Sequence, residues 1–164
     1  MATERGKALA FRFVHEVEKG LVDDPRDPGG ITNFGVSLRF LRGAGIDIDG
    51  DGVINREDIL KLTPEKAQAI YDAHFWKPAG CDALPDAMAL AVYDCAVNQG
   101  VGTARKLLAE ARAWAGRGAS PERVLRDLLT LRSIRYTKTK NFDTYGRGWL
   151  RRVHACGILA GSLL

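Results

Sequence analysis

Cysteine is scarce in this chain of 164 residues, and no apolar run is long. The three cysteines, Cys81, Cys95 and Cys156, cannot all pair with one another, and none has the spacing of a CxxC or metal-binding motif. We therefore expect reduced side chains that pack in the core. The apolar stretch GILAGSLL is far shorter than the roughly 20 residues that a membrane span requires. Stable insertion into a membrane is not expected.

Other signals are missing as well. The chain has no repeat and no helix-turn-helix, RNP or zinc signature, so nucleic acid is not an expected partner. The first residues, MATERGKALAFRFV, lack the apolar core and cleavage site of a signal peptide, which favours synthesis in the cytoplasm. A hydrophobic content of 46% with 27% charged residues is typical of a globular protein, and the length suits one compact monomer.

Charge is distributed unevenly along the chain. Residues 1–82 hold 11 Lys and Arg against 14 Asp and Glu, whereas residues 83–164 hold 13 against 6. The net charges are therefore -3 and +7, and the second half would attract a polyanion. Nucleic acid, anionic lipid and bacterial cell-wall polymers are all polyanions, and charge alone does not choose among them. The alternative is a solvated basic surface without a partner.

The apolar residues recur with a helical period over most of the chain, which predicts a mainly α fold. Thr63 and Ser120, each followed by proline, are predicted N-caps. The segment 22–35 is rich in proline and glycine and is predicted to be a loop, with room for a short β-hairpin through ITNFGV. Helices are expected at about residues 4–19, 36–45, 63–76, 87–97, 102–116 and 120–139, and from 145 or 148 to 159.

The segment DIDGDGVINRED, residues 47–58, has the pattern of an EF-hand loop with predicted helices on both sides. Alternate Asp side chains can converge on a hard cation, and the glycine at position 6 permits the sharp bend. We predict structural Ca²⁺, although Asp in place of Glu at position 12 leaves Mg²⁺ open and resembles dockerin-type loops. Without an ion, four carboxylates would repel one another. The predicted ligands are Asp47, Asp49, Asp51, the carbonyl of Val53, a water held by Asn55, and Asp58.

A second group of carboxylates lies in EKGLVDDPRDPGGITNFG, residues 18–35. Glu18 falls in the last turn of the first predicted helix, where the helix dipole repels a carboxylate, and Asp23, Asp24 and Asp27 follow it. The helix dipole and the like charges of these aspartates both raise the pKa of Glu18. They favour a protonated side chain, as a general acid requires. An Asx turn is the alternative role of Asp24 and Asp27.

These segments carry a resemblance to a known family. EKGLVDDPRDPGGITNFGV resembles the signature of glycoside hydrolase family 108, EGGY followed by VNDPxDPGGxTNxGI, and LTPEKAQAIYDAHFW is similar to that family's LTxxxAxxIYxxxYW. CDALPDAMALAVYDCAVNQGVGTARKLL resembles the start of its predicted peptidoglycan-binding domain. The resemblance covers about residues 8–155.

The resemblance implies a lysozyme-like helical fold and an N-acetylmuramidase of the phage-endolysin or secretion-accessory type. Its substrate would be the β-1,4 bond between N-acetylmuramic acid and N-acetylglucosamine in bacterial peptidoglycan. The family's catalytic acid corresponds to Glu18, and the spacing to Asp27 and Thr32 is similar to the Glu, Asp, Thr constellation of phage-type lysozymes. The peptidoglycan-binding-like segment carries three predicted substrate-binding residues, for which core packing or helix capping is the alternative: Tyr93, Asn98 and Gln99.

Residues 1–82 are thus expected to form the catalytic part with the calcium loop, and residues 83–164 a helical peptidoglycan-binding part packed against it. Action on the cell wall or periplasm would follow release through a holin or a secretion system. Lys19 and Leu21 depart from the family's EGGY motif, and they keep open a non-catalytic, calcium-stabilised peptidoglycan-binding module. Neither the second catalytic group nor the anomeric outcome follows from the sequence, because both depend on distances in space.

Overall fold

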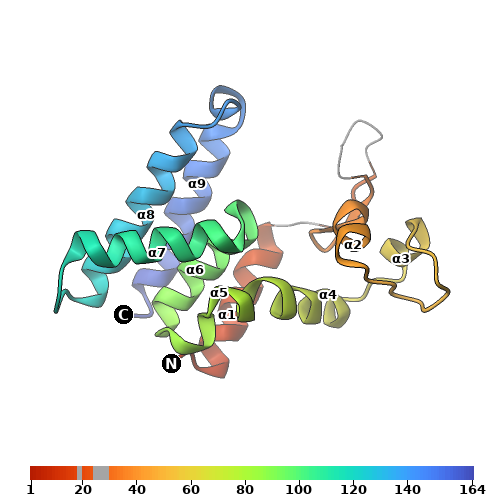
Figure 1. Cartoon of the computed structure of the whole chain (residues 1–164), viewed down its shortest axis with the longest axis horizontal. Helices are drawn as coiled ribbons and strands as arrows, with labels where there is room; N and C mark the ends of the chain where they lie inside the picture. The colour runs from red at the N-terminus through yellow and green to blue at the C-terminus, as the bar shows by residue number, and fades with distance from the viewer. Residues whose placement is uncertain (18–19, 24–29) are drawn as a thin grey trace. The chain divides into compact units, whose positions relative to one another are not determined.

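Helices make up most of the described chain, as the periodicity predicts (Figure 1). The structure is a computed structural model that describes residues 1–17, 20–23 and 30–164. The chain divides into two units. Residues 1–10 and 73–164 form one, here called the helical unit, and residues 11–72 form the other, here called the loop unit. The first helix, α1 (Glu4–Val17), contributes residues to both.

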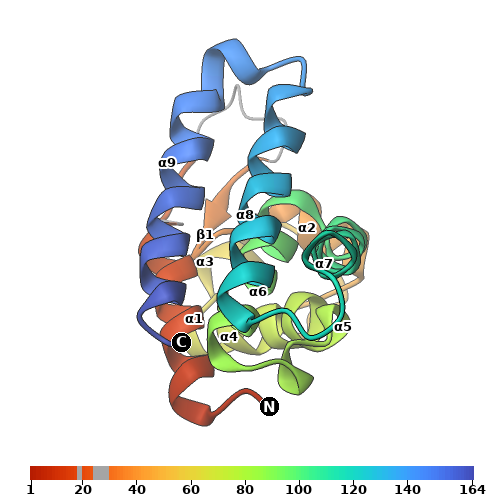
Figure 2. The same ribbon diagram turned by 90° about the vertical axis from the view of Figure 1, so that its left-hand side faces the viewer.

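The helical unit is built around α6 (Asp86–Gln99), whose neighbours include α7 (Val101–Ala115), α8 (Pro121–Thr137) and α9 (Phe142–Gly161). Residues 87–96 of α6 are all buried, because small or apolar side chains on every face let neighbours approach from all sides. Both views show α8 and α9 running antiparallel side by side (Figure 2). The other elements are α5 (Lys77–Ala79) and a 3₁₀ turn (Cys81–Ala83).

The loop unit contains the predicted hairpin. Strands β1 (Thr32–Asn33) and β2 (Val36–Ser37) pair antiparallel, with Thr32 opposite Ser37. Phe34 and Gly35 between them have φ of 48° and 75°, and positive values at both positions are what a type I′ turn requires. The remaining elements are α2 (Leu38–Ala44), α3 (Arg56–Leu60) and α4 (Pro64–Tyr71). A π-helical turn (Asp72–Trp76) follows α4, and all of its residues after Asp72 belong to the helical unit.

Local sequence signals explain where the helices begin. The side chains of Thr63 and Ser120 accept hydrogen bonds from the backbone N–H groups of Lys66 and Arg123, so both predicted N-caps are confirmed. Ser37 caps α2 in the same way, and Gly45, which follows the last residue of α2, has the left-handed conformation.

The last helix begins earlier than predicted, at Phe142 rather than at residue 145 or 148. Gly146 lies within it, and a Cβ at this position would come within 2.6 Å of the Phe142 ring. The glycine therefore lets the ring pack against its own helix. A residue that usually weakens a helix is here a packing requirement.

The predicted fold class, a mainly α lysozyme-like fold with one short hairpin, is confirmed. Cys81, Cys95 and Cys156 are buried and free, as expected. Among the described residues, none of the helices has the length and apolar character needed to cross a bilayer. The functional division into residues 1–82 and 83–164 stays a prediction.

Candidate functional site

The predicted catalytic loop is described at its two ends. Glu18 and Asp27 lie outside the described residues. Helix α1 ends at Val17, and Gly20 has a φ of 62°, the left-handed value that the sequence predicts for the glycine after this helix. The predicted site therefore begins directly after α1.

Backbone pairing closes this loop. Val22 and Thr32 exchange two hydrogen bonds of 2.8 Å, so the two ends of the segment between them meet. The Thr32 hydroxyl is partly exposed and donates to the carbonyl of Gly30 at 3.3 Å. Thr32, predicted to hold a water, is thus held beside Val22 by this backbone pairing.

Helix α3 supports the same region within the loop unit. The Asn33 amide donates to the carbonyl of Ile59 at 3.1 Å, and Arg56 forms an ion pair with Asp23. Ile59 is fully buried. The short helix α3 therefore contacts both the hairpin and Asp23, the residue that follows Val22. A shift of α3 would move the two described ends of the candidate catalytic loop.

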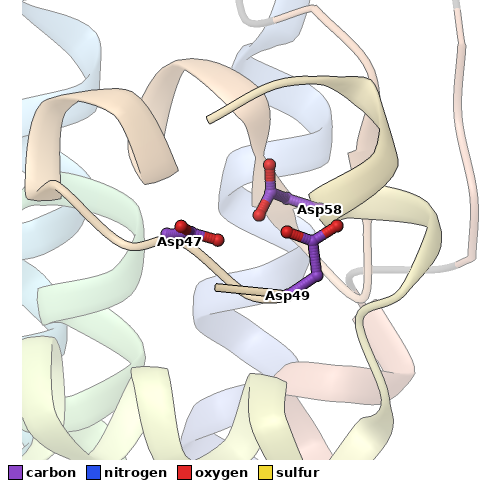
Figure 3. A group of neighbouring side chains, drawn as sticks. All are labelled: Asp47, Asp49 and Asp58. Atoms are coloured by element: carbon purple, nitrogen blue, oxygen red, sulfur yellow. The ribbon is translucent and has the colours of Figure 1, made fainter. Parts of the chain in front are cut away.

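Three of the predicted metal ligands come together just before and within α3. One carboxylate oxygen from each of Asp47, Asp49 and Asp58 lies within 4.8 Å of the others (Figure 3). Asp47 also accepts hydrogen bonds of 2.7 Å from the N–H groups of Gly50 and Gly52. Gly52 has a φ of 86°, so the glycine at loop position 6 makes the bend that the motif predicts.

Asp58 has a structural role that the motif alone did not reveal. It accepts 2.7 Å hydrogen bonds from the N–H groups of Ile48 and Asn55, while the Asn55 side chain accepts from Glu57 at 2.7 Å. Asn55 and Asp58 therefore form a capping box at the start of α3. The hydrogen bond from Asn55 is the main cause of a lowered pKa of Asp58. The spacing N-x-x-D in the sequence could have indicated this capping box.

A lysine lies against the carboxylates. Lys61 Nζ is 2.6 Å from Asp49 Oδ2, and this bond lowers the pKa of Asp49 and raises that of Lys61. Three clustered carboxylates on a loop bent at glycine fit a hard divalent cation, since such ions prefer oxygen ligands. The ammonium group of Lys61 would compete with the ion for Asp49.

The remaining predicted ligands are not part of this cluster. Asp51 accepts from the Val53 N–H at 2.7 Å, and the Val53 carbonyl accepts from the Asn55 amide at 3.3 Å. Asn55 serves as the N-cap of α3. Ligation by Asp51 and Val53, and the water held by Asn55, stay predictions.

Two of the predicted substrate-binding residues line one pocket of the helical unit, with a volume of about 300 Å³. Asn98 and Gln99, at the end of α6, face residues of α8 and α9 across it. Tyr136 and Trp149 stack there with ring centroids 4.9 Å apart. Aromatic rings beside amide groups are suited to a sugar. The lining residues are Asn98, Gln99, Arg135, Tyr136, Thr139 and Trp149.

Tyr93 does not join them in this pocket. It is fully buried in α6 and packs edge-to-face against Trp76, with ring centroids 5.4 Å apart. The structure thus describes a packing role for Tyr93, and its substrate contact stays a prediction.

A buried ionic cluster lies next to the pocket amides. Asp94 Oδ2 is 2.6 Å from Arg132 Nη2, and its Oδ1 is 2.8 Å from Arg152 Nε. Asn98 donates to the Asp94 carbonyl at 3.0 Å, and Gln99 to the Arg132 carbonyl at 3.5 Å. A single aspartate inside the apolar run of α6 was the sequence signal for such a pair.

The comparisons with known proteins agree with this architecture. The family model for glycosyl hydrolase 108 matches residues 11–100, more than half of the chain, and the chain belongs to this family. It is therefore a glycoside hydrolase, and the family favours peptidoglycan as its substrate. The solved structure of SagA from Brucella abortus is similar over 98% of this chain and 97% of that one, with 28% identity and a TM-score of 0.82. No curated protein matches significantly.

Proposed function

We propose that this protein is an N-acetylmuramidase that hydrolyses the β-1,4 bond between N-acetylmuramic acid and N-acetylglucosamine. The observation that carries the proposal is the family match, because residues 11–100 include Glu18, Asp27 and Thr32. The backbone pairing of Val22 with Thr32, and the contacts of α3 with Asn33 and Asp23, agree with a site that must hold its groups in fixed positions.

In this proposal Glu18 is the general acid. It gives its proton to the glycosidic oxygen while the bond from that oxygen to the anomeric carbon breaks, and water supplies the hydroxyl that replaces it. Asp27 stabilises the positive charge that develops on the sugar or accepts the water's proton, and Thr32 holds the water. The separation of the two carboxyl groups would decide between retention and inversion.

The test is the clearing of purified peptidoglycan by Glu18→Gln compared with the wild type. Loss of clearing by more than about a hundredfold, with an unchanged circular dichroism spectrum, supports the acid role. Activity within a few-fold of the wild type would refute it. If the wild type binds peptidoglycan but never clears it at any pH or salt concentration, the non-catalytic alternative replaces the muramidase.

We also propose that the loop at residues 47–58 binds Ca²⁺ as a structural ion. The clustering of Asp47, Asp49 and Asp58 supports this, and Asp51 and Val53 would complete the ligand set. The ion would hold the start of α3, which contacts Asn33 and Asp23. Calorimetry of chelator-treated protein is the test, and a heat of Ca²⁺ binding that survives Asp47→Ala with Asp49→Ala would contradict this location.

The remaining parts of the proposal follow from the substrate. The protein would be made in the cytoplasm and reach the cell wall or periplasm through a holin or a secretion system. It would act as a monomer, with residues 83–164 contributing peptidoglycan binding through Asn98 and Gln99. Light scattering and fractionation of expressing cells would check these points.

A further inference from the structure

Two pockets of the helical unit meet along one side of α8. The first is the pocket of about 300 Å³ that contains Asn98, Gln99 and Trp149. The second, of about 470 Å³, contains Lys106, Trp114 and Lys138 among its lining residues. Arg135 and Thr139 line both, so the pockets are neighbours with Arg135 between them. We call the combined surface the α8 furrow.

The first pocket contains polar groups that lack partners. Tyr136 is 5% exposed, and its hydroxyl has no hydrogen-bond partner in the described part of the chain. Arg135 is exposed, and no carboxylate among the described residues pairs with it. A buried hydroxyl is normally hydrogen-bonded, so the Tyr136 hydroxyl is available to bond with a ligand in this pocket.

The charges around the furrow favour an anion. Arg135, which lines both pockets, carries a positive charge. Lys106 and Lys138 add positive charge in the second pocket, where Glu110 is the acidic lining residue. A cleft with mainly one sign of charge raises the local concentration of a ligand of the other sign.

We propose that the α8 furrow binds a sugar that carries a carboxylate, with the sugar ring at Trp149 and the carboxylate on the guanidinium of Arg135. Tyr136, Asn98 and Gln99 supply hydrogen bonds to hydroxyl and acetamido groups. This inference rests on the proposed function, under which the sugar is the N-acetylmuramic acid of a glycan strand. N-acetylglucosamine lacks the carboxylate. Arg135 is thus a specificity-determining residue that gives the strand its register.

The test is an NMR titration of the full-length, ¹⁵N-labelled protein with N-acetylmuramic acid and, separately, with N-acetylglucosamine. Neither monosaccharide contains the scissile bond, so binding is measured apart from catalysis. We expect the indole N–H signal of Trp149, assigned with Trp149→Phe, to shift with both sugars. A hydrogen bond to a charged group makes the acidic sugar bind roughly tenfold more tightly.

Variants separate the role of Arg135 from general charge. Arg135→Gln should lose the tenfold preference while it retains binding of the neutral sugar. Arg117→Gln removes an equal charge from an exposed loop position outside the furrow and should keep the preference. Arg135→Lys retains the charge without the planar guanidinium group. Its preference for the acidic sugar should therefore lie between those of Arg135→Gln and Arg117→Gln.

Three results would overturn the proposal. One is equal affinity of the wild type for the two sugars, and another is an unchanged preference in Arg135→Gln. The third is a Trp149 signal that responds only to a free stem peptide, whose carboxylates offer the same chemistry without a sugar. If only the hydrolase proposal failed, the furrow would still bind the acidic sugar, but the protein would not clear peptidoglycan.

Discussion

Asp94 and Arg132 form a fully buried ion pair, with 2.6 Å between Oδ2 and Nη2 and no exposed surface on either side chain. The two residues come from α6 and α8, and Arg152 of α9 contacts the other carboxylate oxygen. One carboxylate thus joins three helices of the helical unit. Burying these charges is costly unless they remain paired, so the cluster fixes how the three helices pack.

The first prediction concerns this pair. Asp94→Asn removes the carboxylate that pairs with the fully buried guanidinium of Arg132, and we expect the free energy of unfolding to fall by about 3–5 kcal/mol. Urea denaturation followed by circular dichroism measures the change. Asp127→Asn is the control, because Asp127 pairs with the exposed Arg123 and should lose no more than about 1 kcal/mol. Equal losses in both variants would contradict the buried-pair account.

The second prediction uses two glycines of the loop unit. Gly35 has a φ of 75°, so Gly35→Ala should destabilise the protein by about 1–2 kcal/mol. Gly43 lies in α2, and a Cβ there would meet no atom within 4 Å, so Gly43→Ala should stabilise by up to about 1 kcal/mol. Thermal unfolding of the two variants would show shifts of opposite sign, and shifts of the same sign would rule out the type I′ turn.

The third prediction concerns the competition at the metal loop. Lys61 bonds to Asp49 where the cation would bind, so Lys61→Met should increase Ca²⁺ affinity severalfold in calorimetry. Lys66→Met removes the same charge from a lysine that donates to the carbonyl of Ile48, and it should change the affinity less. An affinity that falls in Lys61→Met would show that the lysine helps to form the site.

The fourth prediction is the behaviour of the thiols at high pH. Burial raises the pKa of Cys81 and Cys156 to about 12 and of Cys95 to about 11, from an ordinary value of 9.0. Folding therefore favours the protonated thiols, and this contribution to stability is complete below pH 9 and is lost as the pH rises through 11 to 12.

Thiolate absorbance near 240 nm tests this directly. The unfolded protein should titrate near pH 9, and the folded protein should show no thiolate until the pH is about two units higher. Reaction of native protein with a thiol reagent at pH 8 should be slow for the same reason. Rapid reaction of all three cysteines in the native state would show that they are accessible.

The sequence by itself determined the local structure and the family. The helical period of the apolar residues, the N-cap residues and the positions of glycine predicted the helices, because these signals act within a few residues. The motif around Glu18 predicted the family that the comparisons confirmed. The EF-hand spacing predicted the clustering of Asp47, Asp49 and Asp58, since ligands within one bent loop need no distant partner.

Only the tertiary structure decided which distant residues meet. Tyr93 follows the helical pattern of a core residue and of a substrate contact equally well, and its burial against Trp76 became visible only once the helices were packed. Arg132, Arg135 and Trp149 have no local signature, yet packing α8 and α9 beside the end of α6 pairs the first with Asp94 and brings the others to one pocket. Such contacts depend on the packing of several helices, which no short stretch of sequence encodes.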